Sequence, residues 1–154
     1  MDQSQLNELS RYFTLVATGN ARDSKKYAEA TANVASSNDE LQTLARLARE
    51  LAKVLISENN VEVIASTLFS FMNEGWEIKK RFHESIASKE VLRAIDLGKS
   101  KGAIASKLCG AGSSGFLLFG HPPEVQMELM SAFPNGFSFP AAFIDRGSQI
   151  VFAS

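Results

Sequence analysis

Hydrophobic residues in the first hundred positions recur at intervals of three and four, a spacing that places them on one face of an α-helix. This spacing and the alanine content predict four helices, over residues 23–35, 41–55, 61–82 and 88–101. Ser88 has the side chain of a helix N-cap, so we expect it to begin the last of these helices. Gly102 is expected just beyond its end, because glycine readily takes the backbone conformation that terminates a helix.

One position in the helix expected over residues 61–82 interrupts a row of large apolar side chains. The apolar positions of that helix are Val61, Ile64, Leu68, Phe71, Gly75, Ile78 and Phe82. Gly75 stands where a large side chain would be expected. We therefore predict that Gly75 is a contact point between helices and that a neighbouring backbone approaches it.

Short runs of aromatic, aliphatic and β-branched residues predict strands before and after the helical region. The expected strands cover residues 12–18, 104–108, 116–119, 137–144 and 149–152. Turns are expected at residues 19–20 and 145–147, and two prolines favour the start of a further helix over residues 122–133. This order predicts an α+β fold, in which helices cover a mostly antiparallel sheet. We expect a single domain over residues 1–154.

Composition and charge exclude several classes of protein. Hydrophobic residues make up 45% and charged residues 21% of the 154 positions, close to the averages of folded soluble domains. The net charge of −1 supplies no basic field, so we expect no binding to nucleic acid. No apolar run approaches the ~20 residues of a membrane span, and the polar, acidic start does not resemble a secretory signal. With Cys109 as the single cysteine, no internal disulfide can form, and we expect a cytoplasmic protein that does not bind membranes.

A glycine-rich stretch over residues 110–115 has the pattern G-x-G-x-x-G, in which missing side chains allow backbone N–H groups to approach a phosphate. A dinucleotide-binding fold needs a helix directly after this pattern, whereas a strand is expected over residues 116–119. The downstream motifs of a protein kinase and the lysine of a Walker loop are also absent. Two interpretations remain at this point: a phosphate-contacting loop, or a tight hairpin connection with glycines at positive φ.

Other reactive residues favour structural roles. Cys109 could act as a nucleophile, but neither His83 nor His121 has a local relation to it, so a small buried residue is the better interpretation. The same three residues do not have the spacing of a zinc site. The basic cluster at residues 79–81 is typical of a solvated helix end, with contact to a phosphate as the alternative. Trp76 is expected to pack.

Three stretches resemble the GHMP kinases, the superfamily of galactokinase, homoserine kinase, mevalonate kinase and phosphomevalonate kinase. Residues 106–119 resemble its third motif, K-L-x-G-A-G-G-G-G-F, with Ser113 and Ser114 at two of the glycines. Residues 73–81, N-E-G-W-E-I-K-K-R, resemble a helix of the D-glycero-D-manno-heptose-phosphate kinase branch. Residues 18–22, T-G-N-A-R, resemble the T-G-x-x-R turn of that branch.

The resemblance implies a fold and the place of a site. The fold would be the ferredoxin-like C-terminal domain of a GHMP kinase, in agreement with the α+β order of elements. In this superfamily the glycine loop lies near the phosphate-binding cleft, so the expected nucleotide-phosphate residues are Lys107, Gly110, Ala111, Gly112, Ser113, Ser114 and Gly115. Thr18, Arg22 and Trp76 are candidates for the substrate side. No catalytic residue or metal ligand is assigned within the chain, because family members carry their main ATP loop and their catalytic acid and base in an N-terminal domain.

The function that the resemblance implies is that of one domain of an ATP-dependent small-molecule kinase, acting on a sugar or sugar phosphate. The complete enzyme would use ATP and Mg²⁺, and neither is expected to bind tightly to this chain. The chain is similar to the C-terminal domain alone, so we expect it to be inactive without an N-terminal kinase domain as its partner. We also expect an exposed apolar patch where that domain would dock, and homodimer formation is left open. The alternatives are a non-catalytic module that binds a metabolite or a partner chain, and a structural fragment.

Overall fold

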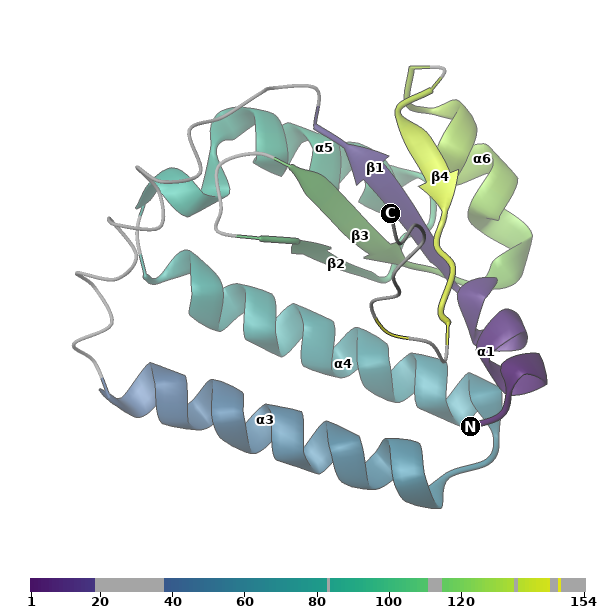
Figure 1. The fold of residues 1–154 in the computed structure, drawn as a ribbon. Coiled ribbons are helices and arrows are strands. Elements are labelled where there is room, and N and C mark those ends of the chain that lie inside the picture. Colours follow the sequence, from purple (N-terminus) through teal and green to yellow (C-terminus); the bar gives the residue numbers. More distant parts are fainter. Residues whose placement is uncertain (19–37, 83, 111–114, 135, 145–146, 148–154) are drawn as a thin grey trace, which may run out of the picture.

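The computed structural model describes residues 1–18, 38–82, 84–110, 115–134, 136–144 and 147. Its centre is a four-stranded sheet in the order β2-β3-β1-β4, and every neighbouring pair is antiparallel. The strands are β1 (Phe13–Ala17), β2 (Ala105–Leu108), β3 (Phe116–Gly120) and β4 (Ser138–Pro140). Helices surround this sheet (Figure 1), so the predicted α+β class with an antiparallel sheet is confirmed.

The register gives the sheet two differently covered faces. On one face, Val16, Leu117 and Phe119 pack in a core with α5 (Lys89–Ser100) and α6 (Gln126–Ser131). Towards the opposite face, a second core joins the strands to α1 (Gln3–Ser10) and α4 (Val61–Lys80). Its buried members are Leu9, Phe13, Val61, Ile64, Ala65, Phe69, Met72, Ala105 and Ala141.

Helix α4 runs beside β2, and α3 (Asn38–Ser57) packs against α4 (Figure 1). The side chain of Asn73 on α4 covers the outer edge of β2, because its amide donates to the Ile104 carbonyl at 3.1 Å and its oxygen accepts from Ser106 N–H at 3.3 Å. An uncovered strand edge is a template for unwanted pairing. The contact therefore ends the sheet on this side.

Most predicted helix boundaries agree with the structure. The helices expected over residues 41–55, 61–82 and 88–101 correspond to α3, α4 and α5. Ser88 accepts a hydrogen bond from Val91 N–H as the N-cap of α5, and Gly102 has a φ of 91° just beyond its end. The predicted N-cap at Ser88 and the predicted glycine beyond the helix end are therefore both confirmed.

The N-terminal helix α1 was not expected from the sequence. Asp2 and Gln5 begin it with a reciprocal capping box, and Leu9 is its single buried residue. So short a helix with one buried position has no apolar row to detect. The prediction treated this stretch only as a polar start.

The end of the described chain differs from the prediction in two ways. The helix expected over residues 122–133 is divided into a 3₁₀ turn, η2 (Pro123–Val125), and α6, while η1 (Glu84–Ala87) is a further 3₁₀ turn. The strand expected over residues 137–144 is wrong beyond Pro140. After this proline, Ala141 N–H still donates to the Phe13 carbonyl at 3.0 Å, and the chain then turns towards α1, where Phe143 N–H donates to the Ser10 hydroxyl at 2.9 Å. The helix expected over residues 23–35, the strand over 149–152 and the turn at 19–20 lie outside the described residues, as does most of the turn at 145–147.

The glycines show where helices and strands approach most closely. A β-carbon built at Gly75 would lie 3.8 Å from Leu44 Cδ2 on α3, an ordinary contact. The predicted contact between helices is confirmed, but the expected backbone approach is wrong, because a leucine side chain fills the space. The closest approaches occur elsewhere: a β-carbon at Gly98 would overlap the Phe119 ring, and one at Gly120 would overlap the Phe69 ring.

Candidate functional site

The glycine-rich stretch connects β2 and β3, which pair as an antiparallel hairpin. Gly110 has a φ of 82° and Gly115 has a φ of 126°, and residues that carry a β-carbon rarely adopt these values. The predicted hairpin connection with glycines at positive φ is therefore confirmed at both of its ends. Ala111, Gly112, Ser113 and Ser114 lie outside the described residues.

Thr18 holds the end of this loop. Its hydroxyl donates to the Gly115 carbonyl at 3.1 Å and accepts from the Gly115 N–H at 2.9 Å. Thr18 N–H also donates to the same carbonyl at 2.9 Å, which continues the pairing of β1 and β3 by one position. A residue predicted for the substrate side is thus joined to the predicted phosphate loop, from which it is separated by 97 positions in the sequence.

Lys79, in the last turn of α4, holds the beginning of the loop. Its ammonium group donates to the Leu108 carbonyl at 3.0 Å and to the Gly110 carbonyl. From the sequence, residues 79–81 are expected to form a solvated helix end or, as the alternative, to contact a phosphate. Bonds from Lys79 to these two carbonyls were not predicted. The one available signal was the place of Lys79 within the stretch 73–81 that resembles a kinase helix.

Two other predicted residues that the structure describes, Lys107 and Trp76, have no side-chain hydrogen bond to the ends of the loop. Lys107 is exposed on β2 and pairs with Leu118 of β3. Trp76 is only 5% exposed and packs in the core with Val16, and the Lys80 ammonium lies 6.0 Å from its ring centroid. Trp76 thus has the packing role expected of it, and a contact with substrate stays a prediction. Arg22 lies outside the described residues.

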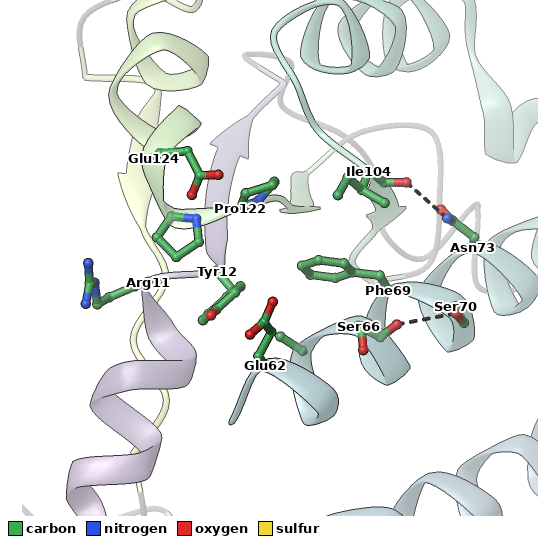
Figure 2. A pocket seen from close by; sticks show the side chains of 12 residues that line it. Arg11, Tyr12, Glu62, Ser66, Phe69, Ser70, Asn73, Ile104, Pro122 and Glu124 are labelled. Carbon is green, nitrogen blue, oxygen red and sulfur yellow. Dashed lines mark hydrogen bonds between the residues drawn. The ribbon is translucent and has the colours of Figure 1, made fainter. Parts of the chain in front are cut away.

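A pocket of about 690 Å³ lies at the other end of the sheet (Figure 2), and neither Gly110 nor Gly115, the described ends of the glycine loop, lines it. It is bounded by the two residues before β1, by residues 62–73 of α4, by the residue before β2 and by residues 122–124 after β3. The lining residues are Arg11, Tyr12, Glu62, Ala65, Ser66, Phe69, Ser70, Asn73, Ile104, Pro122, Pro123 and Glu124. The pocket was not predicted from the sequence, because its walls come from four segments that are far apart along the chain.

Tyr12 lies near acidic side chains at this pocket. Figure 2 shows Glu62 beside Tyr12, with Glu124 farther away. Partial burial, followed by the negative charges of Glu62, Glu8 and Glu124, raises the pKa of the Tyr12 hydroxyl above its usual value, and Arg11 opposes this effect. The potential around the hydroxyl is therefore negative.

His121 forms a buried polar pair beside the pocket. Its Nδ1 lies 2.9 Å from the Pro122 carbonyl, which can only accept, so Nδ1 carries the proton. Its Nε2 then accepts from the Thr14 hydroxyl at 2.9 Å. Burial lowers the pKa of the imidazole and keeps it neutral. Both side chains are fully buried, which gives the pair a structural role.

The described part of the chain contains no group of three or more histidine, cysteine, aspartate or glutamate side chains placed to hold a metal ion. Cys109 is a half-buried free thiol next to the loop. Among the described residues, no helix combines the length and the apolar character needed to cross a membrane.

Comparison with known protein families agrees with this fold. Residues 62–135 match the family model described as GHMP kinases C terminal. The matched region begins in α4 and passes through the glycine hairpin and α6. This stretch, just under half of the chain, therefore resembles a GHMP kinase C-terminal domain.

Solved kinase structures share the fold at low sequence identity. A D-glycero-D-manno-heptose 1-phosphate kinase from Bacteriodes thetaiotaomicron is 21% identical with a TM-score of 0.60, over 96% of this chain and 37% of its own. A Campylobacter jejuni protein assigned as a sugar kinase is 22% identical with a TM-score of 0.65, over 96% of this chain and 40% of its own. The L. major mevalonate kinase, in complex with R-mevalonate, is 13% identical with a TM-score of 0.63, over 81% of this chain and 38% of its own. The chain thus spans about two fifths of the length of these proteins, and no curated protein sequence matches it significantly.

Proposed function

We propose that this chain acts as the C-terminal domain of an ATP-dependent GHMP-type kinase that phosphorylates a sugar or a sugar phosphate. The observation that carries the proposal is the glycine hairpin of this domain, which Lys79 holds at one end and Thr18 at the other. The family match to residues 62–135 supports the kinase class. A contribution to catalysis then depends on what this loop can do for a phosphoryl group.

Phosphoryl transfer depends mainly on positioning and on electrostatic stabilisation of the transferred group. Thr18 and Lys79 hydrogen-bond the two described ends of the loop, Gly115 and Gly110, and this supports a role of the loop in presenting backbone N–H groups to a phosphoryl group. The ammonium of Lys79 is bonded to loop carbonyls, and its positive charge lies beside the loop. We propose that Lys79 positions the loop rather than binding the phosphate itself.

The described residues at the loop ends do not fit a Mg²⁺ site. Mg²⁺ prefers carboxylate and water oxygens, whereas Thr18, Gly110 and Gly115 offer a hydroxyl and carbonyls that are already hydrogen-bonded. No step is therefore assigned to a metal on this chain. The proposal gives the binding of ATP with Mg²⁺, and the catalytic acid and base, to an N-terminal kinase domain as partner.

The similarity over nearly the whole chain favours a sugar substrate over mevalonate. The heptose 1-phosphate kinase and the protein assigned as a sugar kinase match 96% of this chain, against 81% for the L. major mevalonate kinase. The stretches 18–22 and 73–81 also resemble the heptose-phosphate kinase branch. We propose a cytoplasmic location as well, which agrees with the single free thiol.

The test is ATP consumption with a panel of heptose and hexose phosphates. The chain alone is expected to show no sugar-dependent turnover, and addition of the N-terminal domain of a close homologue is expected to restore it. In the restored enzyme, Gly112→Val should lower kcat by crowding the phosphate approach, and Lys79→Met by loosening the loop. Lys53→Met, at an exposed position of α3, is the matched control.

Two outcomes would contradict the proposal. Sugar-dependent turnover by the chain alone would show that no second domain is needed. Tight assembly with the N-terminal domain that binds a sugar phosphate but never consumes ATP would favour the non-catalytic binding module instead.

A further inference from the structure

We propose that the pocket around Tyr12 is a ligand site, separate from the glycine loop, for an organic ammonium ion: a positively charged amine attached to a small apolar group. The ammonium would lie between Glu62 and Glu124 at the Tyr12 ring, and the apolar group would contact Phe69 and the prolines. The proposal does not depend on the kinase function.

The shape of the pocket is that of a small-molecule site. Its volume of about 690 Å³ falls within the roughly 300–1,000 Å³ common for such sites. Its walls come from several packed elements, and Phe69 is both part of the lining and a member of the buried core. The pocket is therefore built on the rigid part of the fold.

The polar groups of the pocket divide into two sets. The hydroxyls of Ser66 and Ser70 donate to carbonyls of their own helix, and the Asn73 side chain is bonded to the edge of β2. By contrast, Tyr12, Glu62 and Glu124 have no side-chain hydrogen bond or ion pair to any residue that the structure describes. These three groups are available to a ligand.

The charges favour a cation. Glu62, Glu8 and Glu124 place negative charge near Tyr12, and Arg11 is the one positive side chain among the described residues of the lining. In Figure 2 the Arg11 side chain extends away from the Tyr12 ring. These negative charges, which add to the effect of burial in raising the pKa of Tyr12, would repel a phosphate or carboxylate and attract an ammonium group.

The remaining surface favours a carbon-bearing cation over a bare metal ion. Aromatic faces attract ammonium groups, and Tyr12 and Phe69 provide two rings in the lining. Ile104, although 54% exposed, Pro122 and Pro123 add apolar surface. A metal ion would gain nothing from these side chains, whereas an amine with an apolar group would use both parts of the pocket.

The experiment is a calorimetric titration of the whole chain with phenethylammonium chloride as the probe. The neutral analogue 2-phenylethanol and the anion phenylacetate serve as controls of ligand charge. We expect saturable binding of the ammonium probe that weakens as salt increases, weaker binding of the alcohol and none of the anion.

Variants locate the site. Glu62→Gln and Glu124→Gln should each weaken binding by roughly two- to fivefold, the range expected for partly exposed charge pairs. Glu74→Gln, at an exposed position later on α4 that does not line the pocket, should leave the affinity unchanged. Because all three carboxylates are exposed, the variants should fold, and thermal unfolding of each checks this.

The proposal is overturned if the ammonium probe does not bind saturably, or if 2-phenylethanol binds as tightly as the ammonium. It is also overturned if Glu74→Gln weakens binding as much as Glu62→Gln, because the effect would then be one of total charge. Chemical-shift changes of backbone amides at residues 11–12 and 122–124 provide an independent readout and should be the largest on titration.

Discussion

The side-chain hydroxyl of Thr18 makes two hydrogen bonds to a single residue, because it donates to the Gly115 carbonyl and accepts from the Gly115 N–H. The two residues come from β1 and from the end of the glycine loop. Because this hydroxyl both donates and accepts, it holds the carbonyl and the N–H of Gly115 at once. This contact is the most direct link between the N-terminal strand and the loop.

Replacing Thr18 with valine keeps the shape of the side chain and removes both bonds. We expect a loss of about 1–2 kcal/mol in the free energy of unfolding and faster hydrogen exchange of the Gly115 amide. Thr43→Val on α3 is the matched control, because Thr43 is exposed and bonds only to a carbonyl of its own helix. Equal exchange rates for Gly115 in the wild-type chain and in Thr18→Val would contradict the role given to Thr18.

Lys79→Met keeps the apolar stem of the side chain and removes the ammonium group. The carbonyls of Leu108 and Gly110 then lose a charged donor, and we expect a loss of about 1 kcal/mol in stability, since the site is partly exposed. Amide chemical shifts at residues 108–110 should change most. Lys80→Met is the control, because Lys80 pairs with Glu77 at the surface, and it should leave these shifts in place.

Gly75 and Gly98 should respond in opposite directions to alanine. Gly98→Ala places a β-carbon into the Phe119 ring, so we expect a loss of about 1–3 kcal/mol. Gly75→Ala meets only Leu44 at contact distance, and the higher helix propensity of alanine should raise stability by up to about 1 kcal/mol. Gly75→Leu should overpack the contact between α3 and α4 and cost about 1–3 kcal/mol. Denaturant unfolding of the three variants checks the order, and an unchanged midpoint for Gly98→Ala would contradict it.

Acid should destabilise the fold through His121. Burial lowers its pKa in the folded chain, so the unfolded chain binds a proton first as the pH falls. Its contribution to stability is therefore complete above the unfolded value of about 6.5 and is lost as the pH falls below it towards the folded pKa. The free energy of unfolding should fall between pH 7 and pH 5, by at most about 1.4 kcal/mol per pH unit for one proton.

Two measurements separate His121 from the other histidine. An NMR titration of the wild-type imidazoles should give His121 the pKa that lies below 6.5. His83→Gln should retain a pH-dependent loss of stability, and His121→Gln should reduce it. A His121 imidazole that titrates above 6.5 would contradict the prediction.

The sheet carries exposed aromatic side chains that favour association. Phe116 on β3 is 46% exposed and Phe139 on β4 is 43% exposed. Their strands flank β1, and Leu15 pairs with both Leu118 and Phe139 in the register. Light scattering should show concentration-dependent association, and Phe116→Ser with Phe139→Ser should reduce it. A strict monomer at high concentration would contradict the docking patch expected from the sequence.

Periodicity was enough to predict α3, α4 and α5, because each has a long apolar face, and short runs of apolar and β-branched residues were enough for β1, β2 and β3. These patterns failed for α1, where Leu9 alone is buried, and for the end of β4, where contacts to α1 follow the last bond to β1. The glycine loop could be predicted because its glycines are adjacent in the sequence. Its hydrogen-bond partners Thr18 and Lys79 could not be predicted, because tertiary packing brings them to the loop.

Helix α4 carries Glu62 at one end and Lys79 at the other. Seventeen positions at 1.5 Å each place these two residues about 25 Å apart along the helix axis. A small amine at Tyr12 and a phosphoryl group at the glycine hairpin would therefore never share a contact, nor compete for the same space. Both α4 and β1 run from one site to the other, so titrating each kind of ligand in the presence of the other would measure any coupling carried by these two elements.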